Sequence, residues 1–252
     1  MFSFLGSLLL AEDISGVKKV MRNVFLNGLK EEINKAPREV TLVAVTKSVG
    51  VNETNEVIKA GVTAIGENRI EDAEKKFPYL LPVEKHFIGQ IQSRKIKRTV
   101  ELFDCIQSVG SISHLQLIEK EAVSQNKNIK ILLQFNISGE GQKGGFGADE
   151  LSNVAIAIRY SLSANSRELA DKIKTISAAD HVQIIGVMGI AADTKDAEVV
   201  RKQFRLLKSI RDRLRAKYPS IAELSMGMSD DYKIALAEGA TMLRIGRALF
   251  SE

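Results

Sequence analysis

The strongest constraint on the fold of this chain is a regular alternation of short apolar runs with longer segments of helical periodicity. Eight runs have the length and composition of strands, at 40–46, 62–66, 85–89, 104–109, 129–137, 182–190, 223–227 and 241–245. Helical patterns lie between them at 52–60, 70–77, 111–125, 196–217 and 230–238, and an amphipathic helix is expected before them over 14–34. Such alternation produces right-handed βαβ units and a parallel sheet. We therefore predict an α/β fold, a single (β/α)₈ TIM barrel with an N-terminal helix.

The length of the chain fits one such barrel. A chain of 252 residues can bury a single core, so we predict one domain over 1–252. Only the segment 147–180 departs from the alternation, because it contains helical patterns around a polar run at 161–166 and no convincing strand. We expect an expanded helical connection there, between the fifth and sixth strands.

Charge and hydropathy argue against nucleic-acid and membrane partners. The net charge of +5 comes from 36 basic and 31 acidic residues that are interleaved along the chain, as on a solvated surface. The longest basic cluster, at 94–98, has no aromatic residues interleaved for base stacking. The apolar segment 2–11 lacks a positively charged leader and is too short to span a bilayer. We expect neither partner.

Cysteine and histidine usage bears on the compartment and on metals. Cys105 is the only cysteine, which excludes an intrachain disulfide and fits a reducing compartment, the cytoplasm. His86, His114 and His181 are far apart and show no paired ligand spacing. We therefore expect no metal site.

Polar residues follow several of the predicted strands, and in a (β/α)₈ barrel the carboxyl ends of the strands open on the face that carries the active site. Lys47 follows the first strand, and Arg244, Gly246 and Arg247 lie at the end of the eighth. A lysine where a buried strand meets a cleft can lose solvation and form a Schiff base with an aldehyde. An Arg-x-Gly turn can hold a phosphate. Together these groups suggest pyridoxal phosphate.

Pyridoxal phosphate needs an amine for its aldehyde, donors for its phosphate, a partner for its pyridine nitrogen and a wall for its ring. Lys47 supplies the amine. Ser229 is expected to open the helix at 230–238, where its hydroxyl and the free amides face the rim, and Gly246 and Arg247 add further amides. Arg244 has only donors, so a pyridine nitrogen that it meets stays unprotonated and the ring becomes a weaker electron sink.

The residues around Ser229 have expected orientations as well. Asp230 and Asp231 would oppose a phosphate if they faced it, so we expect both to point outward as acids of a first helical turn. Met226 and Met228 are expected to pack the top of the barrel.

Seven stretches in order resemble the YggS/PROSC family of pyridoxal-phosphate homeostasis proteins, which is similar in fold to the N-terminal barrel of alanine racemase. They are 42–47, 65–68, 86–89 with Gln92 and Lys95, 136–138 with Lys143, 186–190, 224–231 and 242–246. The resemblance covers about residue 12 to the end. It implies a cytosolic protein that carries pyridoxal 5′-phosphate on Lys47, controls vitamin B6 and has no established catalytic reaction.

The resemblance also assigns residues by position. It implies that Asn68 flanks the cofactor ring, that Arg244 meets the pyridine nitrogen, and that four residues form the phosphate cup, namely Ser225, Ser229, Gly246 and Arg247. Two departures stand out. Ser48, Val49 and Gly50 follow Lys47, where the family usually has a second lysine and a proline, and Arg94 stands where an asparagine is usual.

A purely structural role with an empty barrel and two other ligand-binding functions remain open at this point. One is a pyridoxal-phosphate-dependent amino-acid racemase or decarboxylase, although a racemase needs a second base, usually a tyrosine of an added domain, and only 247–252 follow the last strand. The other is dinucleotide binding at Gly139-x-Gly141-x-x-Gly144, which follows a strand but does not directly open a predicted helix. As partners we expect pyridoxal phosphate and transient contacts with enzymes that use it, and we expect a monomer.

Overall fold

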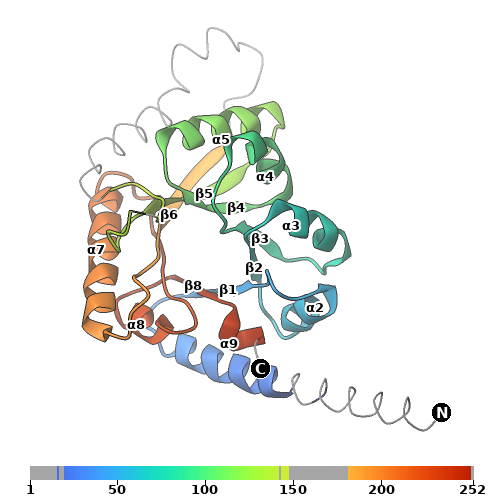
Figure 1. Ribbon diagram of the computed structural model, residues 1–252, viewed down its shortest axis with the longest axis vertical. Coiled ribbons are helices and arrows are strands. Elements are labelled where there is room, and N and C mark those ends of the chain that lie inside the picture. Colours follow the sequence, from blue (N-terminus) through green and yellow to red (C-terminus); the bar gives the residue numbers. More distant parts are fainter. Residues whose placement is uncertain (1–15, 17–19, 142, 148–180, 251–252) are drawn as a thin grey trace, which may run out of the picture.

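Eight parallel strands close into a barrel in the computed structural model, which describes residue 16 and residues 20–141, 143–147 and 181–250 (Figure 1). The strands are β1 (Thr41–Val45), β2 (Ala64–Glu67), β3 (Glu84–Phe87), β4 (Cys105–Val109), β5 (Ile129–Phe135), β6 (Val182–Gly189), β7 (Glu223–Ser225) and β8 (Met242–Ile245). Each pairs with its neighbours in chain order, and β8 returns to β1. The predicted (β/α)₈ barrel and all eight predicted strands are confirmed, with ends that differ by one or two residues.

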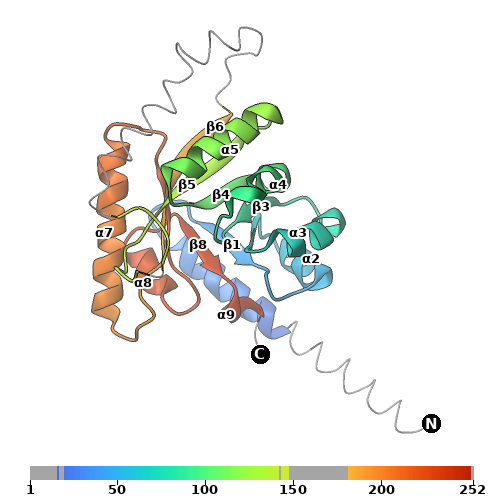
Figure 2. The ribbon, with the colours of Figure 1, turned by 45° about the horizontal axis from the view of Figure 1, so that its top comes forward.

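The helices surround the barrel (Figure 2). They are α2 (Val51–Lys59), α3 (Ile70–Lys76), α4 (Ile96–Leu102), α5 (Ile112–Ser124), α7 (Ala197–Arg215), α8 (Tyr232–Ala237) and α9 (Arg247–Phe250), with 3₁₀ turns η1 (Phe77–Tyr79) and η2 (Ser93–Lys95). The sequence does not predict α4. It is a short helix that begins in a 3₁₀ turn and buries three side chains, which leaves only a weak periodic pattern.

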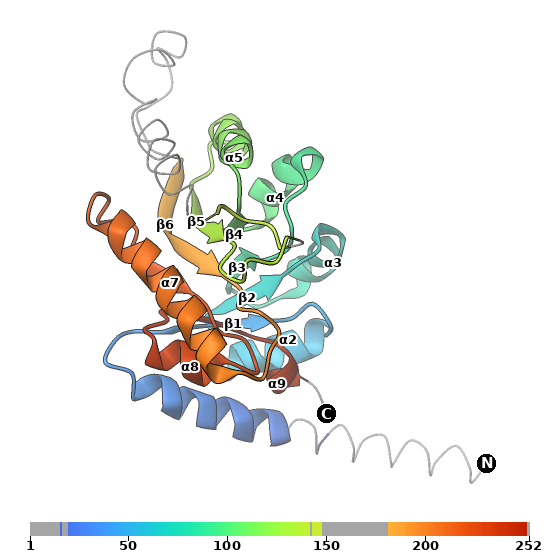
Figure 3. The same ribbon diagram turned by 60° about the vertical axis from the view of Figure 1, so that its left-hand side comes forward.

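The predicted N-terminal helix is present over 20–34 and lies along α8 (Figure 3). It buries Leu26 and Leu29 in the core that the helices share with the outside of the barrel. Ion pairs join its Arg22 to Glu56 of α2, at 2.7 Å, and its Glu32 to Lys233 of α8, at 3.1 Å. The helix therefore covers the side of the barrel where β1 meets β8.

Side chains of each strand alternate between the helices and the barrel interior. In β8, Leu243 and Ile245 belong to the large apolar cluster beneath the helices, whereas Met242 packs in a separate small cluster with Cys105, Leu132 and Met188. Arg244 has the same parity as Met242 and therefore turns inward, where it is 4% exposed. The barrel interior thus holds polar as well as apolar side chains.

Two expectations fall on residues outside the described part of the chain. They are the apolar segment 2–11 and the expanded connection over 147–180, of which only residue 147 is described. Across the described ranges, none of the helices is long and apolar enough to cross a membrane.

Candidate functional site

Lys47 lies in a tight turn directly after β1, at the carboxyl end of the barrel. The amide of Thr46 continues the parallel ladder by donating to the Gly66 carbonyl at 3.0 Å, and the amide of Val49 closes the turn by donating to the Thr46 carbonyl at 3.1 Å. Lys47 is exposed. The expected position at the rim is confirmed, and the turn leaves the Lys47 side chain exposed in this structure, so Schiff-base formation by Lys47 stays a prediction.

A buried ion pair anchors this turn to α3. The Lys76 Nζ lies 2.6 Å from Glu67 Oε1 and donates to the Thr46 carbonyl at 2.7 Å, while Thr46 Oγ1 donates to the same Glu67 oxygen at 2.6 Å. Glu67 is fully buried at the end of β2, and Lys76 is 7% exposed. The residue before Lys47 is therefore fixed by both its carbonyl and its hydroxyl.

Arg244 is held inside the barrel by two hydrogen bonds. Its Nη1 donates to Ser225 Oγ at 2.6 Å, and its Nη2 donates to the Gly189 carbonyl at 2.9 Å. Burial lowers the pKa of Arg244 to about 10, and the Asp231 carboxylate opposes that shift, so the guanidinium stays charged near neutral pH. A guanidinium has five N–H donors, and three remain for other partners.

A chain of hydrogen bonds continues from Arg244 across the interior. Ser225 Oγ donates to Gln107 Oε1 at 2.7 Å, and Gln107 Nε2 lies 2.7 Å from His86 Nδ1. The His86 Nε2 approaches Glu84 to 3.5 Å and, with Lys130, holds the pKa of that carboxyl at about 2. Gln107 was not assigned from the sequence, although a glutamine within a strand that is buried throughout is a recognisable signal.

Ser225 lies in the middle of this chain of hydrogen bonds. Its side chain is fully buried, accepts from Arg244 and donates to Gln107. Its one proton is donated to Gln107, so donation to a phosphate would require that hydrogen bond to break, whereas acceptance from Arg244 could remain. In this structure Ser225 positions Arg244, and its predicted phosphate contact stays a prediction.

Ser229 lies where two loops meet at the rim. Its Oγ accepts from the Ala248 amide at 3.1 Å, which joins the loop after β7 to the turn after β8. A Cβ placed on Gly246 would lie 3.0 Å from Val45 Cβ, so this turn also packs against the end of β1. The prediction that Ser229 opens a helix is wrong, because α8 begins at Tyr232 and the residues before it form a turn.

In the β7–α8 loop, one aspartate and one methionine face outward, and the other two side chains turn inward. Asp230 points outward as expected and pairs with Arg247, and both side chains are exposed. Asp231 does not point outward. Burial raises its pKa, and its Oδ1 accepts from the Met228 amide at 2.6 Å. Met226 is fully buried as expected, whereas Met228 is 37% exposed and does not pack the barrel.

Asn68 follows β2 and is half-buried at the rim. A Cβ on Gly89, after β3, would lie 2.1 Å from the Asn68 carbonyl oxygen, so only glycine allows the two strand ends to approach this closely. The strands β8, β1 and β2 are neighbours in the barrel. Gly246, Lys47 and Asn68 follow these three strands, in that order.

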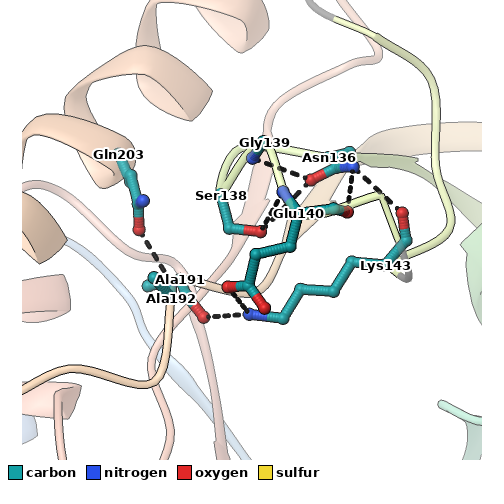
Figure 4. A network of polar contacts seen from close by, with 8 residues as sticks. All are labelled: Asn136, Ser138, Gly139, Glu140, Lys143, Ala191, Ala192 and Gln203. Atoms are coloured by element: carbon teal, nitrogen blue, oxygen red, sulfur yellow. Dashed lines mark hydrogen bonds and ion pairs between the residues drawn. The ribbon is translucent and has the colours of Figure 1, made fainter.

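The segment with the dinucleotide-like glycine spacing is a loop closed upon itself (Figure 4). Asn136 Nδ2 donates to the carbonyls of Glu140 and Lys143, at 2.9 and 3.0 Å, and its Oδ1 accepts from the Gly139 amide at 3.1 Å. Phe146 then pairs beside Phe135 of β5. Within the described residues up to 147, the glycines open no helix, so the dinucleotide reading has no support here.

Comparison with known proteins identifies relatives along most of the chain. The family described as "Alanine racemase, N-terminal domain" matches residues 26–252. A pyridoxal phosphate homeostasis protein of Vibrio alginolyticus is 31% identical over 227 residues, which cover 88% of this chain and 90% of the relative. The protein of the same name from Escherichia coli strain K12 is 30% identical over 224 residues, covering 86% and 87%.

Solved structures of similar fold also match most of this chain. PipY of Synechococcus elongatus with PLP bound has a TM-score of 0.74 and 28% identity, covering 91% of this chain and 100% of PipY. Alanine racemase of Clostridium difficile has a TM-score of 0.70 at 16% identity, and the match covers 92% of this chain but 55% of the racemase. The second likeness shows the shared barrel fold alone.

Proposed function

This chain belongs to the family of pyridoxal phosphate homeostasis proteins, and we propose that it carries pyridoxal 5′-phosphate at the barrel rim and acts in vitamin B6 homeostasis. The observation that carries the proposal is the packing of Gly246 against Val45. That contact joins the β8 turn, with its phosphate donors, to the strand that ends at Lys47. Relatives bearing the homeostasis name and the PipY structure with PLP bound support the same conclusion.

The residues at the rim fit this cofactor chemically. Ser229 and the Ala248 amide provide a hydroxyl and an N–H at one place, and the missing side chain of Gly246 lets the turn that carries Ala248 pack closely against Val45. Arg247 adds a cation beside these donors, although it is already paired with Asp230. Asn68 would flank the ring, and Lys47 would hold the aldehyde as a Schiff base. Bound pyridoxal phosphate supplies a ring that can delocalise negative charge.

Arg244 limits what this ring can do. Its terminal nitrogens are fixed by Ser225 and Gly189, and it offers donors only, so a ring nitrogen that it meets must accept a hydrogen bond. A nitrogen that accepts remains unprotonated, and the ring then stabilises a carbanion poorly. This arrangement suits a protein that holds the cofactor better than one that turns over amino acids.

We further propose that the protein acts in the cytoplasm as a monomer and passes its cofactor to enzymes that use it through transient contacts. Buried Cys105 supports a location where a thiol stays reduced. Burial strongly raises the pKa of that thiol, which keeps it unreactive.

Adding pyridoxal phosphate to the purified chain tests the function directly. We expect one equivalent to produce visible absorption that borohydride reduction abolishes while attaching the cofactor to one lysine. The loaded protein, incubated with L-alanine in deuterated water, should neither exchange the α-proton nor form the D-isomer at enzymatic rates of about 1–10³ per second. Absence of binding would refute the proposal, and rapid exchange would favour the racemase alternative.

The tyrosines of the described chain agree with that expectation. Burial, together with a hydrogen bond to Glu32 of the N-terminal helix, raises the pKa of Tyr232. Tyr79 is 70% exposed beside α3. Tyr218 follows α7 near the amino end of β7. Tyr79 and Tyr218 therefore lie at the amino end of the barrel, away from the rim where a second base would be needed. Tyr232 begins α8 beside the rim, but its side chain interacts with Glu32 of the N-terminal helix.

The two phosphate-binding loops make a testable prediction. Ser229→Ala removes one hydroxyl and should weaken cofactor retention about tenfold, since a hydrogen bond to a charged group contributes about 1.5 kcal/mol or more. Gly246→Val should weaken it further, because the branched side chain meets Val45. Equilibrium dialysis with pyridoxal phosphate measures both effects.

Matched controls separate these effects from general damage. Ser220→Ala changes an exposed serine near the opposite end of β7, and Gly141→Val adds a side chain where nothing lies within 4 Å. Both controls should retain the cofactor normally. Unchanged affinity in Ser229→Ala and Gly246→Val would place the phosphate elsewhere.

A further inference from the structure

A cavity of about 310 Å³ opens across the barrel mouth from the proposed cofactor site. Its walls come from the ends of β3 to β6, from the start of α5 and from the loop that Asn136 closes. Ile88, Phe135 and Ile190 give it an apolar side. Lys47, Ser229 and Gly246 are not among the described residues that line it, so it is a separate space.

The cavity contains a buried hydroxyl with no partner. Ser108 of β4 lines it, is 6% exposed, and has no hydrogen-bond partner for its Oγ within the described ranges. A buried polar group left unpaired costs about 1–3 kcal/mol. A ligand that hydrogen-bonds to Ser108 would remove that cost.

The polar end of the cavity favours an anion. Gly110 and His114 line it on either side of the start of α5, a helix of thirteen residues whose first turn presents amides and a positive dipole end. Ser111 caps the His114 amide at 3.2 Å, which fixes this turn. Lys143 is the only lining residue with a formal charge near neutral pH, since burial lowers the pKa of His114 and no aspartate or glutamate lines the described walls.

From these contacts we propose that the cavity binds a small organic monocarboxylate, with its carboxylate at Ser108 and the start of α5 and its apolar body against Ile88, Phe135 and Ile190. A carboxylate fits better than a phosphate, because Lys143 is already paired with Glu140 at 2.8 Å and the site can compensate little more than one charge. This site is independent of the proposed function, because none of the residues proposed to hold the cofactor lines the cavity.

Contacts connect this cavity to the cofactor site. Gly89, which lines the cavity, packs against the Asn68 backbone. Ile190, on another wall, follows Gly189, whose carbonyl accepts a hydrogen bond from Arg244. A carboxylate bound here would therefore lie beside the groups proposed to surround the cofactor ring.

Titration of the ¹⁵N-labelled full chain with hexanoate, its neutral isostere hexanamide, and inorganic phosphate tests the proposal. We expect hexanoate to shift the amide signals of Gly110, Ile112 and Ser113, and to bind at least fivefold more tightly than hexanamide. Equal affinities would overturn the proposal, and so would phosphate moving the same signals at lower concentration. Because this comparison uses the unmodified chain without added cofactor, its outcome is independent of pyridoxal phosphate binding.

Variants locate the carboxylate. Ser108→Ala should weaken hexanoate binding at least fivefold, and Lys143→Met should weaken it as well, while Ser124→Ala at the far end of α5 should have no effect. Amide signals outside the cavity report whether each variant keeps its fold. Hexanoate binding that is unchanged in a folded Ser108→Ala variant would refute the assignment.

Discussion

Replacing Lys47 with alanine is expected to abolish the visible absorption that pyridoxal phosphate produces on this protein. Lys47 follows β1, and Gly246 of the phosphate-binding turn packs against Val45 at the end of that same strand. The nearby amine of Lys76 is buried and already bonded to Glu67 and the Thr46 carbonyl. Removing the amine removes the covalent link, while the phosphate contacts remain. Absorption spectra and the mass of the borohydride-reduced protein measure the result.

The matched control is Lys59→Ala. Lys59 is an exposed lysine of the same βα unit, at the opposite end of α2, and its loss should leave the absorption and the reduced mass unchanged. If Lys47→Ala kept both signals, another lysine would hold the cofactor. If it lost the absorption but still retained cofactor on dialysis, the phosphate contacts would be shown to act independently.

Lys76→Met should lower the free energy of unfolding by about 3–5 kcal/mol, more than any other substitution proposed above. Among the described residues it removes the one cation paired with Glu67, a carboxylate that is fully buried, and it removes one of the two hydrogen bonds to the Thr46 carbonyl. Urea unfolding followed by circular dichroism measures the change. The turn before Lys47 loses its anchor at the same time, so cofactor retention should fall as well.

The double variant Lys76→Met, Glu67→Gln tests the cause. A neutral amide oxygen can still accept from Thr46 Oγ1 and leaves no buried charge, so the double variant should be more stable than Lys76→Met alone. Lys75→Met changes the exposed neighbour and should alter stability by less than about 0.5 kcal/mol. A single variant as stable as the unmodified chain would show that the buried pair contributes little.

The strands were predictable from the sequence because most are β-rich apolar runs bounded by turn residues, although β3 begins with the charged Glu84 and Lys85 and β7 has only three residues. The rim position of Lys47 followed from the end of such a run. Helix α4 was missed because its seven residues begin in a 3₁₀ turn and show little periodicity. The 3₁₀ start of α4, rather than its length, therefore hid it, since α3 also has seven residues and was predicted.

Side-chain partners at the site were less predictable, because they depend on contacts between distant residues. Ser225 and Gln107 are 118 positions apart, and only the closed barrel brings them together. Asp231 looked like an exposed first-turn acid, but the helix begins one residue later and its carboxylate turns back to the Met228 amide. Local patterns predict which residues reach the rim, whereas the direction of each side chain depends on the whole barrel.

The pairing of β1 with β8 has a consequence for folding. Thr41 lies opposite Met242 and Val43 lies opposite Arg244, so the first strand pairs with the last across almost the whole described chain. Contacts of such long sequence separation form at a high entropic cost, and closing this seam is expected to be a late step. Lys47 and Gly246 lie at the ends of these two strands, so a cofactor that needs both binds only the closed barrel. Binding and closure are then linked, and cofactor at a hundred times its dissociation constant would stabilise the closed state by roughly 2.7 kcal/mol.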